Sequence, residues 1–168
     1  KDGTKDGLWT RWYENGQKKS EVTYKNGQKD GKWTDYYENG QILEEKNYKD
    51  GWNKDGKLII SYHENGQILE EINYKYGKED GMIMYYENGQ MVSRVNYKDG
   101  KPDGKLTYWY FNGQKRSEVA YKDGEKDGKY TEWQENGQKS YEGIYKKGRL
   151  IKSTFWDEDG KVKSRWKQ

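Results

Sequence analysis

The sequence predicts an all-β fold: an elongated meandering antiparallel sheet of tandem β-hairpin repeats. Three observations predict this fold class. Tyr, Trp and Phe make up 16% of the 168 residues, and such rings favour the pleated surface of a strand. The chain contains a single Ala, Ala120, which argues against a helical protein. An Asn-Gly pair, the strongest short hairpin signal, recurs along the chain.

The tight turns define about seven repeat units. Each turn is an Asn-Gly pair except the last, which is Asp-Gly, and the glycines stand 23 to 26 residues apart. Their positions are Gly16, Gly40, Gly66, Gly89, Gly113, Gly137 and Gly160. One unit is too small to bury a core alone, so we expect a single repeat domain over residues 1–168. The expected units are a partial one at about 1–7, then 8–31, 32–56, 57–81, 82–104, 105–128, 129–150 and a degenerate C-terminal cap at 151–168.

Inside a unit the order is strand, tight turn, strand and a looser turn with two glycines, as residues 32–56 show. The third unit has one extra residue in its first strand, Leu58-Ile59-Ile60-Ser61, so we expect a bulge or register correction there. The fourth unit lacks one residue after Gly81, and we expect a register correction there too.

Two columns of aromatic side chains are expected to form a structural ladder that replaces an aliphatic core. The first stands three residues before the Asn or Asp of each turn, and the second stands nine residues after each Asn. The first column is Trp12, Tyr36, Tyr62, Tyr85, Trp109, Trp133 and Trp156. The second column is Tyr24, Tyr48, Tyr74, Tyr97, Tyr121 and Tyr145.

The hairpin register decides which columns share a face. A two-residue loop would place Trp12 opposite Lys19, whereas a three-residue loop with a glycine bulge would place it opposite Lys18. We prefer the second register, because it puts Trp12 on the same face as Val22 and Tyr24.

A third aromatic column directly follows the first and is expected to face the other way. Exposed rings in a row can anchor a protein partner, and they can also stack on sugars. The candidate partner-binding residues are therefore Tyr13, Tyr37, Tyr86 and Tyr110. The row is interrupted by His63 and ends at Gln134 and Asp157.

Other classes of function find little support. The only His is His63, and the chain has no Cys and no nucleophile or phosphate-loop motif, so we expect no enzyme, cofactor or metal site. The Asp-Gly loops are explained by turn chemistry without calcium. A net charge of +3 is too small to indicate nucleic-acid binding, and no apolar run is long enough to span a membrane. The basic segment 146–168 is read as a solvated end, with contact to an anionic surface as the alternative.

Units such as KWTDYYENGQILEEKNYKDGWNKDG and KLTYWYFNGQKRSEVAYKDGEKDG resemble the bacterial variant of the MORN repeat over about residues 1–160. The resemblance implies tandem hairpins in an elongated sheet. Similar sequences carry the label of a YwqK-type antitoxin of a toxin–antitoxin system. Eukaryotic members are associated with membranes, phosphoinositides and scaffolding, and bacterial relatives with surface or periplasmic placement. The resemblance therefore favours export to the periplasm or cell surface, with the cytoplasm as the alternative.

These observations together predict a non-enzymatic repeat scaffold that binds a protein partner along its extended sheet. Three alternatives stay open. The first is a module that binds a cell-surface glycan or the cell wall, and the second is an antitoxin that neutralises a toxin. The third is a scaffold that associates peripherally with membrane lipids.

Overall fold

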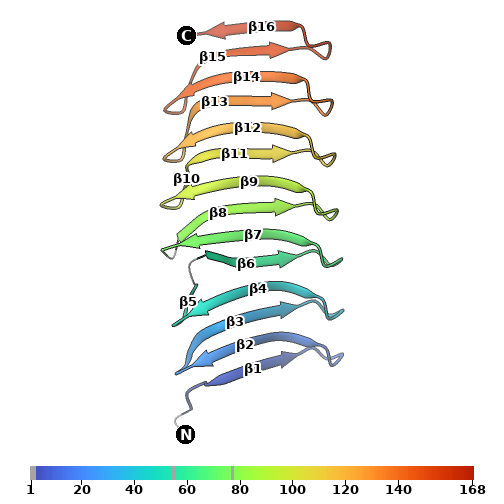
Figure 1. The fold of residues 1–168 in the computed structure, drawn as a ribbon, viewed down its shortest axis with the longest axis vertical. Helices are drawn as coiled ribbons and strands as arrows, with labels where there is room; N and C mark the ends of the chain where they lie inside the picture. Colours follow the sequence, from blue (N-terminus) through green and yellow to red (C-terminus); the bar gives the residue numbers. More distant parts are fainter. Residues whose placement is uncertain (1–2, 54–55, 77) are drawn as a thin grey trace. The chain divides into compact units, whose positions relative to one another are not determined.

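The structure is a computed structural model that describes residues 3–53, 56–76 and 78–168 (Figure 1). Every regular element in these ranges is a β-strand, which confirms the all-β prediction. Contacts divide the chain into two compact units. Unit 1 comprises Lys1–Glu79 and Glu87–Gly89, and unit 2 comprises Asp80–Tyr86 and Gln90–Gln168.

Unit 1 is an antiparallel meander in which each main strand pairs with the next one along the chain. Its main strands are β1 (Gly7–Trp12), β2 (Lys18–Lys25), β3 (Gln28–Tyr36), β4 (Ile42–Lys49), β6 (Gly56–Tyr62) and β7 (Ile68–Lys75). The short strand β5 (Trp52–Asn53) pairs with β4. The bulge expected in the first strand of the third unit is present, as a register shift between Lys57 and Ile59.

Unit 2 repeats the same meander, and β8 begins at the boundary between the units. Its strands are β8 (Lys78–Tyr85), β9 (Met91–Lys98), β11 (Gly104–Trp109), β12 (Lys115–Lys122), β13 (Glu125–Trp133), β14 (Lys139–Lys146), β15 (Arg149–Trp156) and β16 (Val162–Lys167). The short strand β10 (Lys101–Pro102) pairs with β9. Tandem antiparallel hairpins are thus confirmed in both units.

The tight turns show why the Asn-Gly pair is needed. In the first turn Gly16 has φ 83°, a left-handed conformation that favours glycine. The Asn15 side-chain oxygen accepts a hydrogen bond from the backbone N–H of Gln17 at 2.9 Å. Trp12 lies opposite Lys18, with a register shift between Arg11 and Trp12, so the preferred bulged register is confirmed.

The assignment of columns to faces is wrong, however. Beyond the bulge, Thr10 lies opposite Glu21 and Trp9 lies opposite Val22. The Trp9 and Tyr24 rings contact each other with centroids 6.3 Å apart, so Val22 and Tyr24 share a face with Trp9 and not with Trp12. The reason is that the bulge shifts the pairing of β1 with β2 by one residue between Arg11 and Trp12. A shift of one residue exchanges the two faces, so Trp12 lies opposite Lys18 and yet faces away from Val22. We call the two faces the valine face, with Val22 and its equivalents, and the threonine face, with Thr10, Trp12 and their equivalents.

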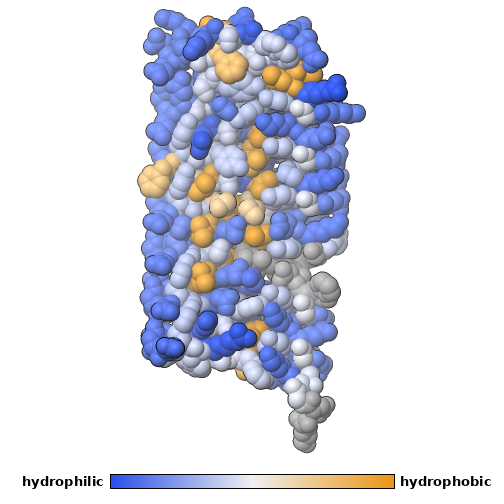
Figure 2. Space-filling view, turned by 180° about the vertical axis from the view of Figure 1, so that it is seen from behind, coloured by the Kyte–Doolittle hydropathy of each residue, from blue (hydrophilic) through white to orange (hydrophobic). Residues whose placement is uncertain are grey.

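Both faces bury side chains, so packing is not one-sided. On the valine face the buried residues include Ile72 in unit 1 and Val95, Val119 and Tyr141 in unit 2. On the threonine face they include Thr34, Thr107 and Thr131. The rings of the predicted ladder are half-buried, except that Trp12 is 59% exposed. In Figure 2 hydrophobic side chains gather along the middle of each unit, and hydrophilic ones line the edges where the turns lie. No helix in the described ranges is long and apolar enough to cross a membrane.

Candidate functional site

The predicted partner-binding tyrosines connect successive hairpins. The Tyr13 hydroxyl donates a 2.8 Å hydrogen bond to the carbonyl oxygen of Tyr36 in the next hairpin. The equivalent bonds run from Tyr37 to Tyr62 (2.8 Å), from Tyr86 to Trp109 (3.3 Å) and from Tyr110 to Trp133 (2.8 Å). These rings are half-buried rather than fully exposed. Their role in partner binding stays a prediction, but their hydroxyl groups already have a structural partner.

Other turn residues make the same kind of connection. The Asn15 side-chain amide donates to the carbonyl oxygen of Glu38 at 3.0 Å, and Asn112 donates to Glu135 at 3.2 Å. Gly40 has φ 84°, which favours glycine, and its missing Cβ leaves room for the Gln17 side-chain oxygen, which would lie 3.1 Å from that atom. The Tyr-x-Asn-Gly-Gln turn is therefore a device that holds neighbouring hairpins together.

A groove of about 410 Å³ opens on the valine face of unit 2, and we call it the aromatic groove. It is lined by Tyr108, Tyr110, Arg116, Ser117, Tyr130, Glu132, Trp133 and Ser140. Ser117 lies between Tyr108 and Glu132 in the pairing of neighbouring strands. Because the Ser117 side chain is small, the taller side chains on both sides of it leave a hollow. Tyr108 is 40% exposed and presents its ring to solvent.

The groove continues into a cluster of rings. Tyr130 contacts Tyr141 with centroids 5.3 Å apart, and Tyr141 contacts Phe155 at 4.8 Å. The Lys126 ammonium group lies 4.5 Å from the Tyr130 ring centroid, a cation–π contact. Sequence reasoning missed these rings because they lie outside the aromatic columns shared by all units. The local excess of rings at Tyr108, Tyr130, Tyr141 and Phe155 was the signal that could have found them.

The polar groups of the groove are suited to binding. The Tyr130 hydroxyl donates to the Glu132 carboxylate, and burial together with this bond raises the pKa of Tyr130. Burial is also the main cause that raises the pKa of Tyr141. The Arg116 guanidinium lies 6.0 Å from the Tyr110 ring. The groove thus offers flat rings with one carboxylate and one guanidinium at its border. Within the described residues, no group of three or more His, Cys, Asp or Glu side chains is placed to hold a metal ion.

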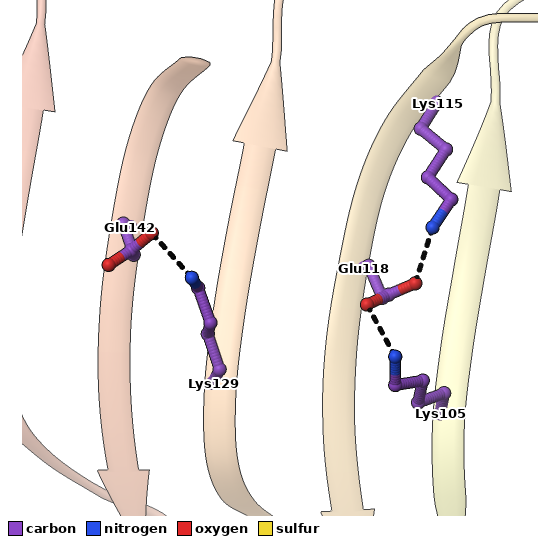
Figure 3. Close-up of polar contacts among 5 residues, drawn as sticks. All are labelled: Lys105, Lys115, Glu118, Lys129 and Glu142. Atoms are coloured by element: carbon purple, nitrogen blue, oxygen red, sulfur yellow. Dashed lines mark hydrogen bonds and ion pairs between the residues drawn. The ribbon is translucent and has the colours of Figure 1, made fainter.

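The threonine face of unit 2 carries a repeated ion-pair motif, in which one glutamate binds two lysines. Figure 3 shows both lysines of Glu118, and Lys129 beside Glu142. Glu118 lies 2.9 Å from Lys105 and 2.7 Å from Lys115. Glu142 lies 2.8 Å from Lys129 and makes a second ion pair with Lys139. The hydrogen bond from Lys115 lowers the pKa of Glu118 most, and that from Lys129 lowers the pKa of Glu142 most.

Basic residues outnumber acidic ones on this face of unit 2. The strand pairing places there the exposed side chains of Arg94, Lys105, Lys115, Lys129, Lys139, Lys152, Arg165 and Lys167. Glu118 and Glu142 lie among these basic side chains, and Glu125 lies on the same face opposite Lys122. Near the C-terminus Lys152, Arg165 and Lys167 have no such glutamate between them.

Two glutamates lie in one row on the valine face of unit 1. Glu44 and Glu70 both pair across strands with Ser61, and they therefore lie in one row. Burial is the main cause that raises the pKa of Glu70, and the negative charges of Glu44 and Glu79 add to it. Glu44 makes an ion pair with Lys46 at 2.5 Å.

One family of known proteins matches this chain. The model of the MORN repeat variant matches residues 5–26, 29–50, 57–76, 82–99, 102–123 and 126–147. These segments follow the hairpins of the structure, and they confirm the resemblance seen in the sequence. No curated protein matches the chain.

Proposed function

Because the chain belongs to the MORN repeat variant family, we propose that it is a non-enzymatic repeat scaffold that binds a protein partner through its sheet. The observation that carries this proposal is the aromatic groove of unit 2. Aromatic side chains at the centre of an interface contribute most of the binding energy in many complexes. A groove between rings offers a place for an apolar side chain of the partner.

The exposed rings around the groove support this choice. Singly exposed apolar residues are normal on a protein surface, but a row of them on one face indicates an interaction site. On the valine face of unit 2, Tyr108 is 40%, Phe155 44% and Trp166 47% exposed. Strand pairing places Phe155 and Trp166 on that face, through Tyr141 and Ser153 respectively. A partner lying across β11 to β16 would contact all three rings.

The charged groups at the groove border would orient the partner. Glu132 accepts hydrogen bonds and Arg116 donates them, so a polar backbone or side chain can bind beside the apolar one. The hydroxyl groups of Tyr130 and Tyr141 are already bonded to Glu132 and Tyr145, so these two rings would offer the partner apolar contact.

The test is partner capture by the full chain and by the double variant Tyr108→Ser, Phe155→Ser. We expect the double variant to stay folded, with a somewhat lower melting temperature from the lost Phe155–Tyr141 contact, and to lose partners that the parent retains. The matched control is Leu8→Ser, which removes another exposed apolar side chain far from the groove in sequence. Retention of every partner by the double variant would contradict the proposal.

The basic threonine face of unit 2 favours a second candidate, the surface of an anionic membrane. Basic residues near such a surface each contribute about 1 kcal/mol, and salt screens the attraction. Vesicles with and without phosphatidylserine test this candidate. We expect the parent to bind only the anionic vesicles, and Lys152→Glu with Arg165→Glu to abolish binding. Equal binding to neutral and anionic vesicles, or unchanged binding by the substituted chain, would exclude the membrane candidate.

A further inference from the structure

One row of side chains on the threonine face of unit 2 alternates tryptophan and lysine. Strand pairing places Lys115 opposite Trp109, and it places Lys139 opposite Trp133. The Lys115 ammonium group lies 5.9 Å from the Trp133 ring centroid, and the Lys139 ammonium group lies 5.8 Å from the Trp156 ring centroid. The row therefore continues from strand to strand across β11 to β15. We call it the Trp–Lys row, and its members are Trp109, Lys115, Trp133, Lys139 and Trp156.

The hairpin fold does not require tryptophan and lysine at these positions. The second and third hairpins of unit 1 carry tyrosine and isoleucine there, in the pairs Tyr36–Ile42 and Tyr62–Ile68. The exchange to tryptophan and lysine adds larger rings and positive charge to a hairpin that forms without either. A local departure from a pattern that already satisfies the fold indicates function.

The two hairpins β11–β12 and β13–β14 also carry one uncompensated positive charge each at this row. Glu118 binds both Lys105 and Lys115, so one glutamate neutralises only one of its two lysines (Figure 3). Glu142 and its two lysines repeat the arrangement in the next hairpin. The side chains of Lys115 and Lys139 are 47% and 42% exposed, so each ammonium group is accessible to a ligand.

The rings and the charges of the row repeat at the same distance. Neighbouring strands lie about 4.8 Å apart, so rings on β11 and β13 stand about 9.6 Å apart across the sheet. The lysines on β12 and β14 have the same separation. Two linked sugar rings of an extended polysaccharide span a similar length. A tryptophan ring offers flat apolar area to a sugar ring, and a lysine offers its charge to a carboxylate. The row thus matches a polymer with one negative charge in every two sugars.

We propose that the Trp–Lys row is a binding site for an acidic polysaccharide that carries one carboxylate per disaccharide. The polymer lies across strands β11 to β14, and sugars of successive disaccharides stack on Trp109 and Trp133. Their carboxylates lie beside Lys115 and Lys139. The row is on the opposite face from the aromatic groove, so the inference goes beyond the proposed protein partner and does not depend on it.

A lipid surface fits the row less well than this polymer does. An anionic bilayer attracts a basic surface through its charge and needs no fixed spacing of rings. In the Trp–Lys row the charges alternate with rings, and the glutamate of each hairpin cancels one of its two lysines. These glutamates weaken attraction to a dense negative charge. The row should therefore prefer one carboxylate per disaccharide over a more densely charged polymer.

The experiment titrates the full chain with hyaluronan oligosaccharides, in which each disaccharide carries one carboxylate, and measures affinity by calorimetry. Polygalacturonate of equal length, with a carboxylate on every ring, and neutral chitin oligosaccharides are compared at the same salt concentration. We expect hyaluronan to bind most tightly. The variant Lys115→Ile with Lys139→Ile should bind it about tenfold more weakly, because two exposed charge pairs are lost. The fold should accept this change, since Ile42 and Ile68 occupy the equivalent positions.

The matched control is Lys25→Ile with Lys98→Ile, which removes the same charge outside the row and should leave the affinity nearly unchanged. An equal loss of affinity in both double variants would show attraction by net charge alone and would overturn the proposal. Tighter binding of polygalacturonate than of hyaluronan would do the same. Failure to bind hyaluronan would also overturn it, and binding to phosphatidylserine vesicles instead would assign the face to a membrane.

Discussion

The hydroxyl group of Tyr110 donates a 2.8 Å hydrogen bond to the carbonyl oxygen of Trp133, one hairpin further along the chain. The two residues belong to different columns of the repeat, and their bond recurs between other hairpins of both units. Each of these four hairpins is thereby fixed to the next at its turn. Such nearest-neighbour contacts are the basis of stability in repeat proteins.

Removal of one of these bonds should have a measurable effect. Tyr110→Phe keeps the ring and deletes the donor, so the free energy of unfolding in urea should fall by about 1 kcal/mol. Tyr108→Phe is the matched control, because the Tyr108 ring is 40% exposed and should lose almost nothing. Identical unfolding curves for the two variants would show that the bond does not stabilise the junction.

Burial on the valine face predicts a second difference. Val119 is 5% exposed, and Val119→Ala should lower the free energy of unfolding by about 2 kcal/mol through lost apolar burial and the resulting cavity. Val162 is 45% exposed, and Val162→Ala should cost well under half as much. The measurement is chemical denaturation of both variants beside the parent. A larger loss of unfolding free energy for Val162→Ala than for Val119→Ala would show that Val119 is not part of the packed core.

The ion pairs of the threonine face should make stability depend on pH and salt. The pKa of Glu118 is lowered in the folded chain, so its contribution is present above the ordinary glutamate pKa and is lost as pH falls through the lowered value. Glu118→Gln should therefore reduce stability at pH 7 by about 0.2–1 kcal/mol at low salt and have little effect in strong acid. Thermal unfolding across pH and salt checks this, and an effect that persists in acid would contradict it.

Glu70 should behave in the opposite way. Its pKa is raised in the folded chain, so its ionised form disfavours folding, and this penalty appears as pH rises from the unfolded pKa through the raised value. Glu70→Gln should therefore increase the melting temperature at pH 7 and leave it nearly unchanged in acid. The same titration of thermal unfolding serves as the measurement. A lower melting temperature at neutral pH would show that the Glu70 carboxylate is stabilised instead.

The sequence by itself determined the local structure. Asn-Gly pairs specify tight turns because their backbone accepts positive φ, and the turn residues also specified the bulge that puts Trp12 opposite Lys18. The extra residue in the first strand of the third unit predicted a bulge in that strand in the same way. These features depend on residues close together in the chain, so the sequence pattern contains them.

Only the tertiary structure decided how distant residues meet. Because of the bulge, Trp12 and Val22 lie on different faces of the sheet, although the predicted pairing of Trp12 with Lys18 is correct. The hydroxyl of Tyr13 donates to the backbone carbonyl of Tyr36, 23 residues away. Every residue has a backbone carbonyl, so the pattern of side chains does not indicate which one accepts this bond. The aromatic groove likewise forms because pairing sets Ser117 between Tyr108 and Glu132. Side-chain contacts across strands depend on register and face together, and a shift of one residue changes every one of them.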